Sequence, residues 1–327
     1  MTERRSRRPT ITEPMKRRVI VTGGAGLVGQ NLAILLDSRP DLDQVYIDKD
    51  PKRIALLHKL HPRVEAVLGD LSEPGPWQER FHPGDTVVIL HAHVTATSAE
   101  PYERNTVRAT RRVLDRALEV GVGDVIHVSS MIVRSKVEDH YARTKKVQEQ
   151  MVLDSGLRVC VLRPTLMYGW FDPKHLGWLA RFMQRVPVFP VPGSGRFIRQ
   201  PLYSMDLGRV IERCIDDFPE GRTYEIVGAE RIEYVELLRM IRAAKGLRRP
   251  FIHLPIPVFR AMLKTYALIS GTPPFTADQL TGLTAGDEFE GEDLKATFGV
   301  TPTPFADGIR ETLTDPRYSD MALPDTA

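Results

Sequence analysis

One turn near the N-terminus limits the folds that this chain can adopt. Residues 22–29 read Thr-Gly-Gly-Ala-Gly-Leu-Val-Gly, directly after a short apolar run and before a stretch of leucines with helical spacing. In such a unit Gly23 permits the tight turn, Gly26 lets the backbone approach a bound phosphate, and Gly29 lets helix and strand pack closely. We therefore expect the chain to begin with a β-strand, a glycine-rich turn and an α-helix.

Short β-rich runs and helical patterns alternate after this unit. The runs cover residues 44–48, 64–68, 86–90, 124–128 and 158–162, and the clearest helical patterns cover 105–119 and 141–155. This alternation predicts an α/β fold with a Rossmann-like, doubly wound parallel sheet. After Gly169 the pattern changes to loops rich in Gly and Pro and isolated helices, which predicts a smaller C-terminal substrate-binding lobe.

An acidic residue follows the glycine turn at the distance that a dinucleotide site needs. Asp48 lies 25 residues after Gly23, at the end of the next predicted strand. Its carboxylate would accept hydrogen bonds from the adenosine ribose hydroxyls and repel a 2′-phosphate, which favours NAD. Lys49 and Arg53 stand close by and would admit NADP, so this alternative remains open.

Tyr141 and Lys145 are candidates for proton transfer. A helix brings residues four apart onto one face, so the Lys145 ammonium can lie beside the Tyr141 phenol. A nearby ammonium favours the phenolate and lowers a pKa that is normally about 10, which would make Tyr141 an acid/base near neutral pH. Together with the glycine turn, this pair predicts an oxidoreductase that uses a nicotinamide cofactor.

From about Arg18 to about Leu313 the chain resembles the short-chain dehydrogenase/reductase family, in its extended, epimerase/dehydratase-like branch. The resemblance rests on the glycine turn, Val128-Ser-Ser130, Tyr141 with Lys145, Leu162-Arg-Pro164 with Tyr168-Gly169, and Arg199 leading to Asp206. It implies that Ser130 hydrogen-bonds the substrate oxygen and that Tyr141 passes the proton. Lys145 would tune Tyr141 and hold the nicotinamide ribose.

The same resemblance implies which residues line the cofactor and the substrate. The expected cofactor residues are Gly23, Gly26, Leu27, Val28, Asp48, Lys49, Asp70, Leu71, Ala92, Tyr141, Lys145 and Pro164. Ser130, Leu166 and Arg199 are the expected substrate contacts. The expected division is a basic disordered tail over residues 1–17, an NAD(P)-binding domain over 18–169 and a lobe formed mainly by 170–327. In this family pieces of such a lobe are often interleaved with the core.

Several positions depart from the family pattern and mark an atypical member. Only eleven positions separate Ser130 from Tyr141, and Arg134-Ser135 replaces the usual Tyr-Gly, so the loop that shapes the substrate pocket is short. His93 replaces a small residue, and the family's asparagine aligns with Thr106. These changes do not affect hydride chemistry itself, but they weaken any analogy about the substrate.

Three functions fit these residues. Arg199 is typical of enzymes that bind a substrate diphosphate, which indicates oxidation, reduction or epimerisation of a nucleotide-linked sugar. Met131 and Ile132 stand where dehydratases have an acidic pair, so sugar 4,6-dehydration is disfavoured. Nucleotide-sugar enzymes commonly have an asparagine at position 166, and Leu166 instead favours an apolar alcohol or ketone of steroid, terpenoid or flavonoid type.

An apolar pocket could be lined by Leu166, Met167, Trp170, Phe171, Trp178 and Met183, although the same residues could form the core of the lobe. The third function is that of a non-catalytic NAD(P)-binding sensor or assembly protein. The intact Ser130, Tyr141 and Lys145 argue against it.

Composition limits the partners and the compartment. The net charge is only +3, and much of the positive charge lies in the first 18 residues, which we interpret as a solvated tail that contacts neither nucleic acid nor membrane. Residues 251–270 form an apolar segment, but Arg260 and Lys264 within it make it too polar for a helix that spans a membrane. Cys160 and Cys214 predict reduced core thiols in a cytoplasmic protein, with no metal site. The expected partner is a small-molecule substrate, and a homodimer is left open.

Overall fold

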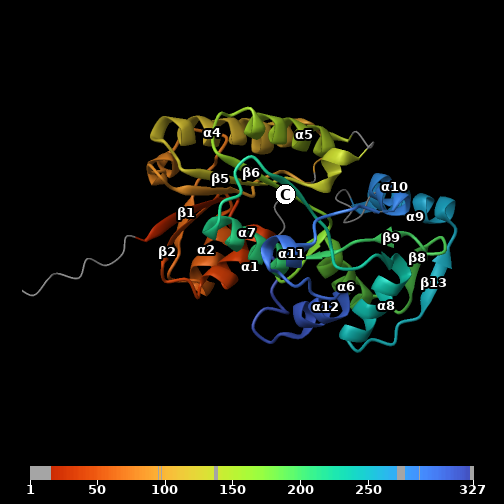
Figure 1. Ribbon diagram of the computed structural model, residues 1–327. Helices are drawn as coiled ribbons and strands as arrows, with labels where there is room; N and C mark the ends of the chain where they lie inside the picture. The colour runs from red at the N-terminus through yellow and green to blue at the C-terminus, as the bar shows by residue number, and fades with distance from the viewer. Residues whose placement is uncertain are drawn as a thin grey trace, which may run out of the picture.

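A seven-stranded parallel sheet forms the centre of the molecule (Figure 1). The computed structural model describes residues 16–94, 96, 98–135, 139–270, 277–286 and 288–324. The sheet has the order β11-β6-β5-β4-β1-β2-β3, in which every neighbouring pair is parallel. The predicted Rossmann-like doubly wound fold is therefore confirmed. Nearly all of the expected basic tail lies outside the described residues.

The strands of this sheet follow the predicted β-rich runs closely. They are β1 (Arg17–Thr22), β2 (Leu42–Asp48), β3 (Glu65–Leu68), β4 (Thr86–Ile89), β5 (Asp124–Val128), β6 (Val159–Pro164) and β11 (Thr223–Ile226). The first six come from the N-terminal half, whereas β11 returns from the second half of the chain and pairs with β6.

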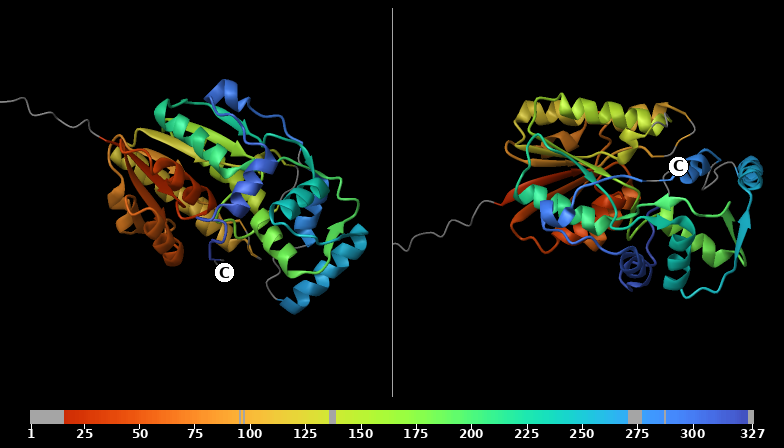
Figure 2. Two further views of the ribbon diagram at one scale, coloured as in Figure 1. Left: turned by 90° about the horizontal axis from the view of Figure 1, so that it is seen from below. Right: turned by 45° about the vertical axis from the view of Figure 1, so that its right-hand side comes forward.

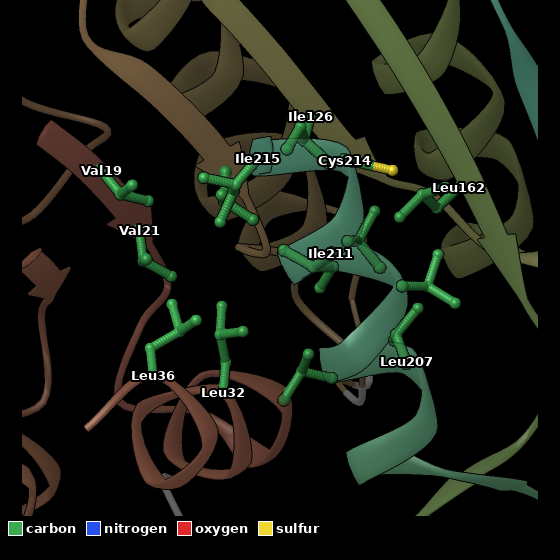
Figure 3. Packing of buried hydrophobic residues seen from close by; sticks show 14 of the residues in the cluster. Val19, Val21, Leu32, Leu36, Ile126, Leu162, Leu207, Ile211, Cys214 and Ile215 are labelled. Carbon is green, nitrogen blue, oxygen red and sulfur yellow. The ribbon is translucent and has the colours of Figure 1, made fainter. Parts of the chain in front are cut away.

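Helices cover both faces of the sheet. One face carries α1 (Leu27–Leu36) and α7 (Ser204–Asp216), and α2 (Pro51–Leu60) adds Leu57 to the same cluster. Figure 3 shows the packing: Leu32 and Leu36 of α1 and Ile211 of α7 point toward Val19 and Val21 of β1. Each fully buried leucine stabilises the fold by about 1.5–3 kcal/mol. Leucines at helical spacing share one face, so a helix buries them together, and their spacing therefore predicts α1 correctly.

The opposite face is covered by α4 (Ala109–Val120) and α5 (His140–Leu153), which contribute Val113 and Val152 to a second cluster with strand residues (Figure 1). Short helical segments lie in the connections. They are η1 (Pro76–Arg80), α3 (Glu100–Tyr102), the π-helical η2 (Glu103–Arg108) and η3 (Met131–Arg134).

A smaller lobe lies to one side of the sheet (Figures 1 and 2). It has three short pairs of strands: β7 (Met167–Tyr168) with β10 (Leu202–Tyr203), β8 (Phe189–Pro192) with β13 (Phe251–Leu254), and β9 (Ile198–Arg199) with β12 (Ile232–Glu233). The remaining helices are α6 (His175–Arg185), α8 (Tyr234–Ala244), α9 (Ile256–Ser270), α10 (Ala277–Ala285), α11 (Leu294–Phe298) and α12 (Phe305–Thr314).

The lobe has its own hydrophobic core. Trp170, Phe171 and Met183 are buried in it, whereas Leu166 and Met167 are half-buried. Three of the six residues considered as pocket lining thus pack inside the lobe instead.

Both cysteines are free and buried. In the described part of the chain, no helix combines the length and the apolarity needed to cross a bilayer. Nor do the described His, Cys, Asp and Glu side chains come together in threes in a way that could hold a metal ion.

Candidate active site

The glycine turn between β1 and α1 is so tight that side chains would not fit. Gly23 has a φ of +70°, and a Cβ there would lie 2.7 Å from the Cα of His91. At Gly29 a Cβ would lie 2.0 Å from the carbonyl oxygen of Gly24. The predicted strand–turn–helix unit is thus present.

This turn leaves the N-terminus of α1 open to an anion. Gly26 is the N-cap and supplies no side-chain cap, and the first turn of α1 carries no acidic residue. The first N–H groups of a helix, here those of Leu27 and Val28, have no partner within the helix and carry the positive end of its dipole. A diphosphate such as that of a dinucleotide fits these groups.

Asp48 lies beside the turn at the end of β2. One carboxylate oxygen accepts the Ala25 N–H at 3.2 Å, and the other accepts the Asp50 N–H at 3.1 Å. Burial raises the pKa of Asp48 above its ordinary value. The carboxylate is therefore held in place by the backbone of the turn, where it can accept further hydrogen bonds from hydroxyl groups.

The cations near Asp48 are hydrogen-bonded to other parts of the chain. Lys49 Nζ donates to Asn105 Oδ1 at 2.7 Å, and the Arg53 guanidinium donates to the carbonyl oxygen of Pro324 at 2.7 Å. The second contact joins α2 to the C-terminal segment. Local sequence gives no signal for it, because the two residues are 271 positions apart.

Asp70 is also held by neighbours. Its carboxylate accepts the Ser72 hydroxyl at 2.6 Å and the Arg104 guanidinium at 2.8 Å. Burial acts to raise the pKa of Asp70, but these hydrogen bonds and the Arg104 charge outweigh it and lower the pKa. The neighbouring Leu71 is buried in the core under the sheet, and Ala92 is half-buried at the end of β4.

The structure brings Ser130 and Tyr141 together. Ser130 follows β5 as the N-cap of η3, and Tyr141 is the second residue of α5. Burial raises the pKa of Tyr141 to about 12, and the nearby Ser130 side chain acts in the opposite direction, so the two side chains lie close together. The short loop between the two residues is therefore compatible with contact between the catalytic candidates.

Lys145 lies one turn further along α5 and is fully buried. Its Nζ donates to Val128 O at 3.1 Å and to Gln148 Oε1 at 2.6 Å. Burial lowers the pKa of Lys145 to about 7. The sequence predicted that Lys145 would lower the pKa of Tyr141. In this structure the pKa of Tyr141 is instead raised. The physical reason is that the ammonium is bound by two other acceptors and burial dominates at the phenol.

A buried polar network continues from Lys145 beneath the site. The Gln148 amide donates to His91 O at 3.0 Å and to Thr110 Oγ1 at 2.8 Å. The His91 ring lies 2.8 Å from Thr22 Oγ1 and 2.9 Å from Thr110 Oγ1, and burial lowers the pKa of His91 to about 3. Sequence reasoning did not find Gln148 or Thr110, because buried polar residues resemble exposed ones in a helical pattern.

The expected substrate residues come from other elements. Pro164 ends β6, and Leu166 follows it, with its carbonyl oxygen accepting the Leu202 N–H at 2.8 Å. Arg199 is half-buried on β9, near enough to Tyr234 for its charge to act on that phenol. Leu166 thus lies where the chain leaves the sheet, and Arg199 lies in the lobe.

The model of the NAD-dependent epimerase/dehydratase family matches residues 19–227, which contain the turn, Asp48 and the Ser130–Tyr141–Lys145 group. The chain belongs to this family.

Other members are similar over most of the chain. UDP-glucose 4-epimerase from Vibrio cholerae is 26% identical over 330 residues, covering 91% of this chain and 95% of the relative. A 3β-hydroxysteroid dehydrogenase/isomerase from Mycobacterium tuberculosis is 25% identical over 276 residues, covering 74% and 73%. The dTDP-glucose 4,6-dehydratase from Streptomyces venezuelae, solved with NAD, has a TM-score of 0.71 at 20% identity and covers 92% of this chain and 98% of its own.

This epimerase/dehydratase-family member is therefore an NAD-dependent enzyme of the extended short-chain type, which confirms the resemblance. The enzyme acts on a hydroxyl or keto group, and its cofactor is NAD. The open N-terminus of α1 and the hydroxyl-accepting carboxylate of Asp48 fit that cofactor.

Proposed function

We propose that the enzyme oxidises and reduces a carbinol carbon of a nucleotide-linked sugar, with Ser130, Tyr141 and Lys145 as its catalytic residues. The proximity of Ser130 and Tyr141 beside the buried Lys145 carries this proposal. A serine and a tyrosine that lie this close can both contact one substrate oxygen. The family name is consistent with epimerisation, which follows when the ketone turns over in the site and hydride returns to its opposite face.

Each catalytic residue has a separate task. The Ser130 hydroxyl positions the substrate oxygen, and the Tyr141 oxygen takes the proton of an alcohol or returns it to a ketone. The bound nicotinamide supplies the acceptor and donor of hydride. Lys145, with a pKa near 7, can exist in both protonation states at neutral pH. Turned from Gln148 toward the phenol, its ammonium would favour the Tyr141 phenolate.

The cofactor is proposed to lie along the turn. Gly23, Gly26, Leu27 and Val28 would contact the diphosphate, and Asp48 the adenosine ribose. Lys49, Asp70, Leu71 and Ala92 would line the adenosine side of the site, and Tyr141, Lys145 and Pro164 the nicotinamide side. We propose a preference for NAD over NADP because the Asp48 carboxylate repels a 2′-phosphate.

Arg199 supports the nucleotide-sugar substrate. A guanidinium can bind a diphosphate through paired, charge-assisted hydrogen bonds. The Vibrio cholerae relative is named as a UDP-glucose 4-epimerase, which supports the same class.

A second candidate is an apolar alcohol or ketone. Leu166 and Met167 are half-buried where the chain leaves the sheet, and apolar side chains at this place suit a steroid-like substrate. The Mycobacterium tuberculosis relative, named as a hydroxysteroid dehydrogenase, supports this alternative.

Calorimetry of nucleoside diphosphates distinguishes the two classes. Uridine or thymidine diphosphate should bind the NAD-loaded enzyme, and Arg199→Ala should raise the dissociation constant roughly ten- to a hundredfold, since a lost hydrogen bond to a charged group is worth ~1.5–3 kcal/mol. Arg196→Ala, an exposed arginine close to β9, is the control and should leave binding unchanged.

If wild-type enzyme binds neither diphosphate, the nucleotide-sugar proposal fails. A panel of sugars and apolar alcohols assayed for NADH formation then tests the second candidate, in which Leu166→Asn should weaken binding.

We also propose that the enzyme works in the cytoplasm, which its free cysteines support. A homodimer stays a prediction.

A further inference from the structure

Helix α9 exposes an apolar face at the outer edge of the lobe, away from the sheet (Figures 1 and 2). Val258, Met262 and Tyr266 are 53%, 40% and 49% exposed, and Leu268 is more exposed still. These residues belong to a set of twelve exposed large apolar side chains among the described residues, and five of the twelve fall between Ile252 and Leu268. The clustering matters because apolar side chains exposed singly are ordinary, whereas contiguous ones mark an interaction surface.

The positions around the helix separate this face from the buried one. With a rotation of about 100° per residue, Val258, Met262 and Tyr266 form one ridge, and Phe259 and Leu263 form the next. Phe259 and Leu263 are buried against Leu280 of α10. The outward ridge therefore does not hold the helix to the lobe.

Positive charge lies on the face of α9 opposite to the apolar ridge. Arg260 and Lys264 are exposed and, at the same rotation per residue, lie on the side of α9 away from the Val258–Tyr266 ridge. The sequence from Leu237 to Ala277 contains seven Lys and Arg residues and no Asp or Glu in 41 positions. A surface helix with an apolar face and a basic face has the chemistry of helices that lie in the plane of a lipid surface.

We propose that α9 binds the surface of an anionic membrane, with Val258, Met262 and Tyr266 inserted between the lipids and Arg260 and Lys264 among the head groups. The proposal differs from the expectation of no membrane contact, which considered only spanning helices and the N-terminal tail. It does not depend on the substrate. A second copy of this chain is the competing occupant of this face, and the sedimentation experiment below distinguishes it from a membrane.

Vesicle flotation with the full chain tests the proposal. The wild type should float with vesicles that contain phosphatidylglycerol, float much less with pure phosphatidylcholine, and be released as salt is raised. The double variant Met262→Ser/Lys264→Gln should bind anionic vesicles roughly twentyfold more weakly. One basic residue near an anionic surface raises the affinity about fivefold, and burial of the Met262 side chain raises it about as much.

A matched control exists on α4, on the other side of the molecule. Arg111→Gln/Leu118→Ser also removes one exposed basic and one exposed apolar side chain, and it should bind vesicles like the wild type. As an independent probe, the emission of Tyr266→Trp should shift to shorter wavelength only when anionic vesicles are added.

Three outcomes would overturn the proposal. The first is wild-type enzyme that does not bind anionic vesicles. The second is equal vesicle binding by the wild type and the Met262→Ser/Lys264→Gln variant, which would assign the contact to the basic N-terminus. The third is a dimer in sedimentation velocity that the α9 variant loses while vesicles remain unbound. Thermal unfolding of each variant verifies that it is folded.

Discussion

Lys145 Nζ lies 2.6 Å from Gln148 Oε1, three residues along α5, and this contact joins the proposed catalytic lysine to a buried network. The same glutamine donates to His91 O and to Thr110 Oγ1, so its amide has a fixed orientation. A fixed acceptor stabilises the charged form of a lysine whose pKa burial has already lowered to about 7. Gln148 is therefore a positioning residue for Lys145.

Replacing Gln148 with Leu should lower the pKa of Lys145 further. A hydrogen bond to a charged group is worth ~1.5–3 kcal/mol, so the limb of the kcat/KM profile that depends on Lys145 should move about one to two pH units to lower pH. Gln148→Glu should move it the other way. Gln150→Leu, on the exposed side of the same helix, is the control. An unchanged pH profile of kcat/KM would show that this part of the profile does not depend on the titration of Lys145.

Tyr141→Phe should reduce turnover on the order of 10²-fold or more while leaving NAD affinity nearly unchanged, because only the proton-transferring hydroxyl is lost. Lys145→Ala should reduce both. Rates come from NADH absorbance and affinities from tryptophan fluorescence. Tyr318→Phe, which removes a hydroxyl in the lobe, should behave like the wild type. Near-normal turnover by Tyr141→Phe would refute the catalytic assignment.

The enzyme should bind NAD more tightly than NADP, and Asp48→Asn should narrow the difference by removing the charge that repels the 2′-phosphate. Because burial raises the pKa of Asp48, the preference should also weaken as the pH is lowered and the carboxylate protonates. Fluorescence titration of both cofactors measures this. Asp43→Asn, exposed on the same strand, controls for net charge. Tighter binding of NADP by the wild type would show that Lys49 and Arg53 dominate.

Gly29→Ala should destabilise the fold strongly. The new Cβ would lie 2.0 Å from Gly24 O, a backbone atom that cannot move without opening the turn, so the loss should exceed about 3 kcal/mol. Gly282→Ala in α10 is the matched control, because a Cβ there meets nothing within 4 Å. It should be neutral or stabilise by up to about 1 kcal/mol through helix propensity. Urea unfolding of both variants provides the measurement.

Stability should fall as the pH drops below about 6.5, the ordinary histidine pKa. Burial lowers the pKa of His91 to about 3 and that of His127 well below its ordinary value. Below 6.5 the unfolded chain therefore binds protons that the folded chain does not. Each group should reduce the free energy of unfolding by about 2 kcal/mol between about pH 6.5 and pH 5.

His127→Leu tests the origin of this effect. Among the described residues, neither ring nitrogen of His127 has a hydrogen-bond partner, so the variant should keep its stability near pH 7 and lose part of the pH dependence. His58→Leu, exposed on α2, should keep the wild-type curve. An unchanged curve for His127→Leu would mean that other groups cause the loss.

Much of the sheet could be predicted from sequence because its first six strands and their helices are local patterns. The glycine turn and the runs at 44–48 and 124–128 correspond to β1–α1, β2 and β5. The sequence assigned the chain after Gly169 mainly to the lobe, whereas β11 joins the main sheet. Local sequence cannot show this, because a four-residue strand carries no information about a partner sixty residues earlier.

The site divides in the same way. The family resemblance implied that Ser130 and Tyr141 act on the same substrate oxygen, and strand ends and helix starts do gather at one edge of a parallel sheet. Spacing placed Lys145 on the face of Tyr141 but could not show that Val128 O and Gln148 would bind its ammonium. The Arg53–Pro324 contact also depends on tertiary packing alone.

The return of α7 and β11 to the first half of the fold has a consequence for synthesis. Leu207 and Ile211 of α7, with Tyr224 and Ile226 of β11, complete the core that covers Val21 and Leu162. A nascent chain that ends near residue 169 leaves the part of that apolar face that α7 covers, and the edge of β6, exposed. We therefore expect the cofactor-binding half to complete its core only after about 60 further residues have emerged.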